Sequence, residues 1–580
     1  MEKYYSSEKN TQILVSLMKA HKVRKIVVSP GTTNICLVQS LQNDPYFELY
    51  SSVDERSAAY IACGLAEESG EPVALSCTGA TASRNYVSGL TEAYYRKLPV
   101  LAITATQHIG RIGHNIAQVI DRTNPINDIA KLSIHVPTIH DEEDKWAYTV
   151  AMNNALLELR RHGGGPVHIN LTTTYSDDFS VKELPDVQVI QRICIKDEFP
   201  KLEGNKVGIF VGAHSKWSER LIELVDAFCE KYNAVVIRDN TSNYKGKYGV
   251  NVNLFTSQEQ YNSPCKNIDL LIHIGNVSGA YISVMQKETW RVNPDGEVRD
   301  TFKKLSHVFE MEEEAFFEYY VNYAPKNTTQ NTYYHEVREE YAKFYNKIPE
   351  LPFSNVWIAK QTAHRIPENS IVHFGILNTL RAWNFFELSN SVYGYSNTGG
   401  FGIDGCVSSL LGASLANPNK LHFGIVGDLA FFYDMNVLGN RHFSNNIRLM
   451  VINNGVGTEF KNYNHKAAKF GKEADAYMAA RGHYGQQSAE LLKHYATDLG
   501  YSYILASNKE EYLSNLGYFL SAEMYDKPVI FEVFTNSQDE SDSIFMMNNL
   551  EISATGAAKK LARNILGEKG VKTVKGLLSK

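Results

Sequence analysis

Two short polar motifs follow neighbouring apolar runs in the last third of the sequence. The run "LHFGIVG" ends at Gly427-Asp428, and the next run, "IRLMVI", ends shortly before Asn454. Asp428 and Asn454 lie 26 positions apart, about the length of one strand–helix–strand crossover. Because right-handed crossovers bring both strand ends to one edge of a parallel sheet, the two side chains are predicted to meet at the carboxyl edge.

This pair of residues offers hard oxygen ligands to a metal ion. One carboxylate, one amide oxygen and a backbone carbonyl, for which Val456 is the candidate, form half of the oxygen shell that Mg²⁺ prefers. Phosphates and water would complete the shell, and the N-terminus of the helix after Asp428 would attract the same phosphates. Two ordinary turns are the alternative explanation; the combined spacing favours a metal and diphosphate site.

A second candidate lies in the stretch "SSVDERSAAYIACGLAEESG", residues 51–70. Glu55 stands at the start of a predicted helix, directly after Asp54, which is a possible N-cap. An acid at this place can simply complement the helix dipole, which is worth about 0.3–1 kcal/mol. The body of this helix is made mostly of small residues, which predicts close packing against a partner chain: Ala58, Ala59, Ala62, Cys63 and Gly64.

The elements that position these residues alternate between short apolar runs and helical patterns. Runs such as "KIVVS", "PVLAITA" and "KPVIFEVF", separated by helical segments, predict an α/β fold with central parallel sheets flanked by helices. Polar stretches after about residues 176 and 321 divide the chain into three parts. The predicted domains are 1–180, a middle domain at 190–325 and a third at 350–550, followed by a basic C-terminal tail at 551–580.

The first and third parts share a local pattern of a small-residue helix, a polar break and a strand that ends in glycine. The pattern occurs in "AAYIACGLAEESGEPVALSCTG" and again in "CVSSLLGASLANPNKLHFGIVGD". Since α/β proteins reuse this arrangement, chance is one explanation. We favour an ancient duplication, which predicts two similar domains with different roles.

Composition restricts the class of protein. The chain has 580 residues and a formal net charge of -6, so it has no general attraction for nucleic acid or anionic lipid. Its seven cysteines form no CxxC pair, which predicts reduced, buried thiols rather than disulfides or a zinc site. No apolar run approaches the roughly 18 residues that span a bilayer, and the N-terminus lacks a signal-peptide pattern. We therefore expect a cytoplasmic protein.

Together, these motifs resemble the thiamine diphosphate-dependent enzyme superfamily. The segments "VVSPGTTN", "DERSAAY", "GFGIDG" and "GDLAFFYDMNVL" are most similar to the menaquinone-pathway carboligases, the 2-succinyl-5-enolpyruvyl-6-hydroxy-3-cyclohexene-1-carboxylate synthases. Acetolactate synthases are more distant relatives. The resemblance extends to about residue 550. It implies pyrimidine-binding, middle and diphosphate-binding domains in that order, with thiamine diphosphate and Mg²⁺ as cofactors.

The resemblance also implies roles for single residues. Glu55 matches the acid that hydrogen-bonds the aminopyrimidine ring and activates the cofactor. Gly427, Asp428 and Asn454 match the diphosphate and metal site, Ile403 matches the apolar residue beneath the bent cofactor, and Gln118 matches a glutamine that touches the reacting carbon. In the superfamily the cofactor lies between two chains, so we expect a dimer or tetramer.

The sequence departs from these relatives at the positions that hold anionic substrates. Arginines are expected where this chain has Thr33, Gln107 and Thr398, and only Arg381 is retained. Because arginine is suited to planar recognition of carboxylates, we expect a 2-oxo acid donor and a neutral or aldehyde-type acceptor, not isochorismate. The substrate-binding candidates are Thr32, Thr33, Gln107, His108 and Arg381. Glu459 and Lys461 are expected to face solvent, with the substrate as the alternative.

The sequence therefore predicts a carboligase that decarboxylates a 2-oxo acid and transfers the acyl anion equivalent to an acceptor. A simple 2-oxo acid decarboxylase or another C–C lyase remains an alternative. So do a non-catalytic scaffold and an NAD-binding dehydrogenase, since residues 400–405 read GxGxxG. The basic residues after position 557 form a possible amphipathic helix, but a solvated or oligomer-packing tail is expected rather than a membrane contact.

Overall fold

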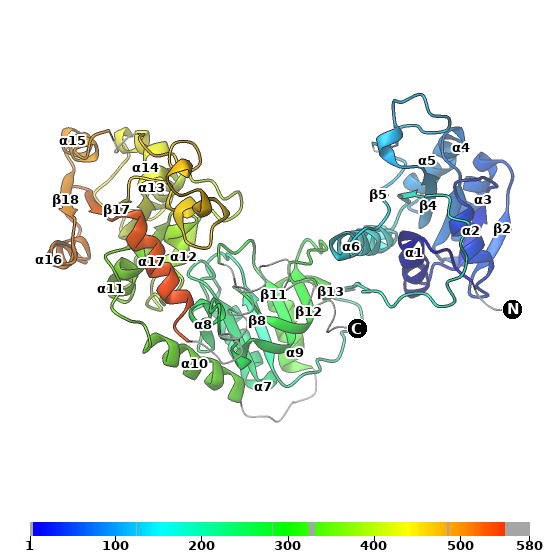
Figure 1. The fold of residues 1–580 in the computed structure, drawn as a ribbon. Helices are drawn as coiled ribbons and strands as arrows, with labels where there is room; N and C mark the ends of the chain where they lie inside the picture. Colours follow the sequence, from blue (N-terminus) through cyan, green and yellow to red (C-terminus); the bar gives the residue numbers. More distant parts are fainter. Residues whose placement is uncertain (1–3, 123, 281, 324–330, 484–486, 552–580) are drawn as a thin grey trace. The chain divides into compact units, whose positions relative to one another are not determined.

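The computed structural model describes residues 4–122, 124–280, 282–323, 331–483 and 487–551. These residues form two compact units (Figure 1). The first unit holds the described residues up to Glu198 together with Asp295–Glu310. The second holds Phe199–Pro294 and the described residues from Met311 onward. The predicted domain limits stay a prediction.

The first unit is built on a parallel six-stranded sheet with the order β2-β1-β3-β4-β6-β5. Its two faces carry separate cores: Ile26 packs with α1 and α6, whereas its neighbour Val27 packs with α3 and α5. Both faces are thus covered, as expected for a parallel sheet. The strands are β1 Lys25–Val28, β2 Glu48–Ser51, β3 Val73–Cys77, β4 Val100–Thr106, β5 Leu132–Val136 and β6 Val167–Thr172. The helices are α1 Lys9–Ala20, α2 Ile35–Gln42, α3 Glu55–Ser69, α4 Thr81–Asn85, α5 Val87–Tyr95 and α6 Glu142–Glu158.

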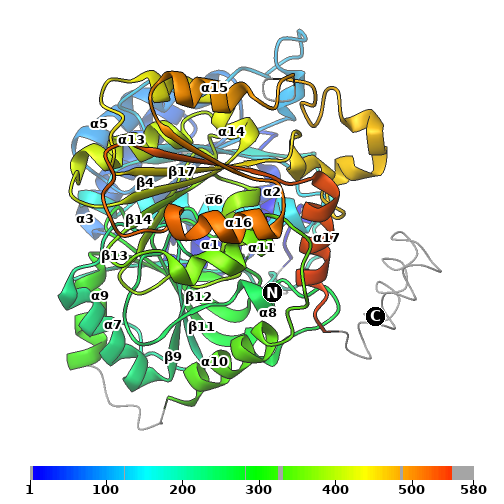
Figure 2. The same cartoon turned by 90° about the vertical axis from the view of Figure 1, so that its left-hand side faces the viewer.

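The second unit contains a further six-stranded parallel sheet, with the order β15-β14-β16-β17-β19-β18. Counted within each sheet, both orders are the same, which supports the predicted duplication. Figure 2 shows α11 beside α17, the first and last helices of this part. The strands are β14 Ile371–Phe374, β15 Tyr393–Ser396, β16 His422–Gly427, β17 Ile447–Asn453, β18 Ser502–Ala506 and β19 Val529–Phe534. The helices are α11 Asn355–Thr362, α12 Asn378–Trp383, α13 Cys406–Ala416, α14 Asp428–Tyr433, α15 Leu491–Asp498, α16 Lys509–Phe519 and α17 Ser537–Asn548.

The middle part of the chain adds a third group of parallel strands. Within the second unit their order is β10-β9-β8-β11-β12, and α7 lies beside α9 (Figure 1). These elements are β8 Val207–Val211, β9 Ala234–Arg238, β10 Gly249–Asn251, β11 Asn267–Ile274, β12 Met285–Asn293, α7 Glu219–Tyr232, α8 Asn253–Thr256, α9 Glu313–Asn322 and α10 Thr332–Tyr345. In the first unit, β7 (Gln191–Cys194) pairs with β13 (Leu305–Glu310). The predicted α/β class with parallel sheets flanked by helices is confirmed.

Two further expectations can be compared with the structure. In the described part of the chain, no helix is long and apolar enough to cross a membrane. Five of the seven free cysteines are buried, but Cys194 is exposed and Cys265 is half-buried, so the expectation of buried thiols is wrong for these two. Cys194 ends the short strand β7, whose outward positions reach solvent. The predicted basic tail lies outside the described residues except for Glu551.

Candidate active site

The carboxyl edge of the sheet in the second unit brings Asp428 and Asn454 together. Strands β16 and β17 are parallel neighbours, with Gly427 opposite Ile452. Asp428 begins α14 directly after β16, and its Oδ2 accepts a hydrogen bond of 2.9 Å from the Gly455 backbone N–H. The side chain of Asp428 is thereby tied to the turn that carries Asn454, as the spacing of the two motifs predicts.

The chemistry of this pair fits a divalent cation. Asn454 Oδ1 is buried and has no hydrogen-bond partner among the described residues. Asp428 is only 7% exposed; this burial raises the pKa of its carboxyl group to about 7, and the nearby charge of Glu532 acts in the same direction. A cation would stabilise the ionised carboxylate and take the unpartnered amide oxygen. The third candidate ligand, the Val456 carbonyl, accepts a hydrogen bond of 3.2 Å from Thr458 Oγ1.

The backbone around this pair leaves room for a ligand. A Cβ added at Gly427, directly before Asp428, would meet nothing within 4 Å. Ile403 lies in the loop before α13, half-buried against the core of this sheet. The described residues contain no group of three or more His, Cys, Asp and Glu placed to hold a metal. The predicted site takes only Asp428 from these residue types, so the two observations are compatible.

A series of buried hydrogen bonds holds Asn453, the residue before Asn454, and it was not predicted from the sequence. Asn453 Nδ2 donates to Glu532 Oε1, and the Tyr503 hydroxyl donates to Glu532 Oε2, both at 2.7 Å. Burial raises the pKa of the Glu532 carboxyl group. The available signal was an acid within the apolar strand "KPVIFEVF", since such a group is buried only with partners.

Arg381 and Glu459 form an ion pair at the same edge. Arg381 lies on α12, which follows β14, and Glu459 lies in the 3₁₀ turn η6 (Thr458–Lys461), which follows β17. Arg381 Nη1 is 2.5 Å from Glu459 Oε1, and each side chain is 20% exposed. Lys461 pairs in turn with Asp475 at 2.5 Å. The expectation that Glu459 and Lys461 face solvent is therefore wrong, because each is held by an oppositely charged partner.

In the first unit, Glu55 is the first residue of α3. Asp54 caps the helix by accepting hydrogen bonds from the N–H groups of Arg56 and Ser57. Glu55 is half-buried, and its Oε2 accepts a hydrogen bond of 3.2 Å from Asn85 Nδ2 at the end of α4. Since Asp54 already caps the helix, the Glu55 carboxylate is directed to Asn85 instead.

Thr33 and Gln118 lie around Gly79 at the carboxyl edge of the first sheet. Thr33 is buried; its hydroxyl accepts a hydrogen bond from Gly79 N and lies 2.5 Å from the Thr78 hydroxyl. A Cβ added at Gly79 would stand 3.2 Å from the Gln118 carbonyl oxygen. Gln118 and Ala80 both have positive φ, 63° and 58°. Such strained conformations concentrate at functional sites.

The remaining substrate candidates of the first unit have local partners or face solvent. Thr32 is exposed. Gln107 accepts a hydrogen bond from Arg111, and His108 Nδ1 accepts one of 3.0 Å from Gly110 N, which caps the 3₁₀ turn η1 (Ile109–Arg111). These contacts hold the loop after β4. The structure does not bring Gln107 or His108 into hydrogen-bond contact with Thr33.

The small residues of α3 serve a different purpose from the predicted one. Ala59 faces Gly89 of α5 so closely that a Cβ at Gly89 would stand 2.4 Å from Ala59 Cβ. Cys63 Sγ lies 3.3 Å from the Gly89 carbonyl oxygen. Helix α3 therefore packs its small face against its own chain, while Tyr60 and Ile61 are 48% and 43% exposed. The prediction that the small face meets a partner chain is wrong, apart from the exposed Gly64.

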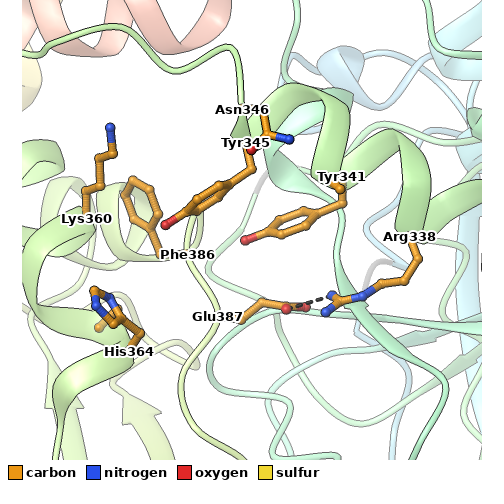
Figure 3. Close-up of a pocket in the computed structure, with 10 residues that line it drawn as sticks. Arg338, Tyr341, Tyr345, Asn346, Lys360, His364, Phe386 and Glu387 are labelled. Atoms are coloured by element: carbon orange, nitrogen blue, oxygen red, sulfur yellow. Dashed lines mark hydrogen bonds and ion pairs between the residues drawn. The ribbon is translucent and has the colours of Figure 1, made fainter.

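A separate pocket of about 310 Å³ lies elsewhere in the second unit, between α10, α11 and the loop after α12 (Figure 3). The aromatic rings of Tyr341, Tyr345 and Phe386 line it, and Arg338 pairs with Glu387 at 2.7 Å on its wall. It contains none of the predicted site residues. The candidate site is therefore defined by the strand ends and not by this cavity.

Comparison with known proteins agrees with the site chemistry. Residues 9–124 match the family "Thiamine pyrophosphate enzyme, N-terminal TPP binding domain". The 2-succinyl-5-enolpyruvyl-6-hydroxy-3-cyclohexene-1-carboxylate synthase of Bacteroides fragilis is 30% identical, over 93% of this chain and 98% of its own. The synthase of the same name from Phocaeicola vulgatus is 30% identical over 93% and 97%, and that of Desulfotalea psychrophila is 28% identical over 89% and 96%. The chain therefore belongs to the family of these synthases among the thiamine diphosphate-dependent enzymes, and it is an enzyme of C–C bond chemistry that uses thiamine diphosphate with a divalent metal, typically Mg²⁺.

Proposed function

We propose that this enzyme decarboxylates a 2-oxo acid and transfers the remaining acyl group to a neutral or aldehyde-type acceptor. The observation that carries the proposal is the meeting of Asp428 with the turn of Asn454, whose Oδ1 is buried without a partner among the described residues. This oxygen set matches a diphosphate-bound metal. The relatives give no support to the dinucleotide-binding or scaffold alternatives.

Each residue of the site has a defined task in this proposal. Thiamine diphosphate, when bound, supplies the electron sink for decarboxylation and the nucleophile for C–C bond formation. Asp428, Asn454 and the Val456 carbonyl hold the metal, and Ile403 supports the ligand from the core side. Glu55 holds a proton at its carboxylate. Gln118 orients the substrate.

Three neutral residues stand at positions where arginines were expected, and they favour an acceptor without several carboxylates. Thr33 is neutral and already bonded to Thr78 and Gly79, and Gln107 is bonded to Arg111. Thr398 is a third neutral residue and is buried. Without bidentate guanidinium groups at these positions, an acceptor with several carboxylates such as isochorismate lacks its counter-charges.

We further propose that the active form is a cytoplasmic dimer or tetramer, with Glu55 and Asp428 contributed by different chains. Apolar side chains on the outer side of α3 and just before it support this arrangement: Val53, Tyr60 and Ile61 are 79%, 48% and 43% exposed. Three large apolar side chains grouped near the predicted catalytic acid suit a protein interface.

The test is carbon dioxide release from a panel of 2-oxo acids, with thiamine diphosphate and Mg²⁺, in the presence and absence of aldehydes. We expect release that depends on both the cofactor and an aldehyde acceptor. Release without any acceptor would replace the carboligase with a simple decarboxylase. Equal turnover of isochorismate and aldehydes would contradict the proposed acceptor class.

A further inference from the structure

We propose that Glu459 determines substrate charge selectivity by neutralising Arg381, so that the pair accepts a neutral hydroxyl or carbonyl group and rejects a carboxylate. The inference rests on the proposed function, because it concerns the acceptor side of the same site. It assigns a role to Glu459, a residue that sequence reasoning directed to solvent. The two side chains form one ion pair at 2.5 Å.

The pair lies where a substrate of this sheet edge would be handled. Arg381 is on α12, which begins soon after β14, and the intervening Gly375 approaches the backbone of Val426 and Gly427. Glu459 comes three residues after Val456, in a turn closed by the hydrogen bond from Phe460 N to Gly457 O. Both side chains thus lie on helical turns that follow β14 and β17, the two neighbours of β16, at the edge where open α/β sheets bind ligands.

The Glu459 carboxylate is fixed and not a loose surface charge. Arg381 Nη1 donates to Oε1 at 2.5 Å. With its amide turned to satisfy its neighbours, Asn378 donates to Oε2 and accepts from the Glu459 backbone N–H, both at 2.8 Å. Both carboxylate oxygens are therefore engaged by α12, and the glutamate holds one geometry relative to Arg381.

The chemical consequence concerns substrates that carry a second negative charge. A carboxylate approaching Arg381 would have to displace Glu459 or lie beside it, and like charges side by side in a partly buried site repel. A neutral hydroxyl meets no such penalty, since it can donate to Glu459 and accept from Arg381. The neighbouring cation Lys461 cannot compensate, because it is bound to Asp475 and to the Gly471 carbonyl oxygen.

The experiment uses the full-length holoenzyme with thiamine diphosphate and Mg²⁺. Glu459→Gln keeps the shape of the side chain and frees the charge of Arg381. Glu473→Gln is the matched control, because it also removes one negative charge from an exposed acid in the nearby turn η7 (Lys466–Ala474) but leaves the Arg381–Glu459 and Lys461–Asp475 pairs intact. Two probes are compared, benzaldehyde and 4-carboxybenzaldehyde, by kcat/KM for acceptor use and by calorimetric binding to the holoenzyme.

We expect Glu459→Gln to raise the preference for 4-carboxybenzaldehyde over benzaldehyde roughly ten- to hundredfold, the usual range for a hydrogen bond to a charged group. The double variant Glu459→Gln/Arg381→Gln should lose this gain, and Glu473→Gln should leave the ratio unchanged. An unchanged preference in Glu459→Gln, or an equal change in Glu473→Gln, would overturn the inference. Calorimetry separates the two proposals: absent turnover with a shifted binding preference would reject the proposed reaction and keep the role of Glu459.

Discussion

The two six-stranded sheets share one strand order but carry different chemistry at their carboxyl edges. In the first sheet, the helix between the second and third strands is α3, which begins with Glu55 behind the Asp54 cap. In the other sheet the corresponding helix is α13, which begins after a glycine-rich loop and has no side-chain cap. There the acid comes from the next strand end instead, as Asp428 after β16. The shared strand order places both acids at the carboxyl edge of a sheet, and the residue at each strand end determines the chemistry of that edge.

A second comparison concerns one junction that both sheets contain. The first helix and the end of the last strand are joined by a buried glutamate in each case. Glu8 precedes α1 and accepts from the backbone and hydroxyl of Thr174, just past β6. Glu540 lies on α17, past β19, and accepts from the Asn355 N–H at the start of α11. The two sheets thus make the same connection with the glutamate on opposite elements, before the first helix in one and after the last strand in the other.

Removing the acid of the second-unit sheet should have the largest effect on activity. Asp428→Ala deletes the carboxylate that we assign to the metal, and even outer-shell changes cost metal sites about 10–100-fold. We expect activity near background and loss of Mg²⁺-dependent thiamine diphosphate binding, measured by calorimetry. Asp498→Asn, an exposed acid on α15, is the control. Normal cofactor binding by Asp428→Ala would reject the metal assignment.

Removing the acid of the first sheet should act on turnover and spare binding. Glu55→Gln keeps the size and the hydrogen bond to Asn85 but cannot hold a transferable proton. Because positioned acid–base groups contribute about 10²–10⁴-fold, we expect kcat to fall within that range while the thiamine diphosphate Kd changes little. Glu68→Gln, an exposed acid on the same helix, should behave as wild type. Full turnover by Glu55→Gln would show that the Glu55 carboxylate is not the acid that the proposed reaction requires.

The sequence was sufficient for features encoded by local periodicity and spacing. The parallel sheets followed from alternating apolar runs and helices, and the meeting of Asp428 with the Asn454 turn followed from the length of one crossover. Both depend on contacts between neighbouring strands, here Gly427 opposite Ile452. Glu55 at a helix start was equally readable, because Asp54 supplies a cap by residue type alone.

Contacts between residues far apart in the sequence could not be predicted in this way. Arg381 and Glu459 are 78 positions apart, and Asn453 and Glu532 are 79 apart. No local pattern connects such residues, since the elements that carry them meet only once the whole sheet is assembled. The small residues of α3 predicted close packing against another element, but the pattern within one helix does not indicate which element that is; in the structure it is α5.

Glu540, the buried glutamate of the shared junction in the second unit, predicts that the stability of the protein depends on pH. Burial raises the pKa of Glu540 to about 7, above the 4.5 of an exposed glutamate. Its stabilising contribution is complete below pH 4.5 and is lost as pH rises to 7, because the unfolded chain ionises first; the loss approaches about 3 kcal/mol. Glu540→Gln should remove this slope in denaturant unfolding at pH 5 and 7.5, whereas Glu523→Gln, an exposed control, should not. A slope unchanged in Glu540→Gln would mean that the buried carboxyl is ionised in the folded state.

The smallest effects come from the contact between α3 and α5. Gly89→Ala places a methyl group 2.4 Å from Ala59, so we expect a loss of about 1–3 kcal/mol in the free energy of unfolding. Gly64→Ala on the outer side of α3 meets nothing within 4 Å, and a helical Gly-to-Ala change should stabilise by about 0.5–1 kcal/mol. Denaturant titration at two protein concentrations measures both. Destabilisation by Gly64→Ala that grows on dilution would place Gly64 in a subunit interface; a neutral Gly89→Ala would show that α3 and α5 separate without cost.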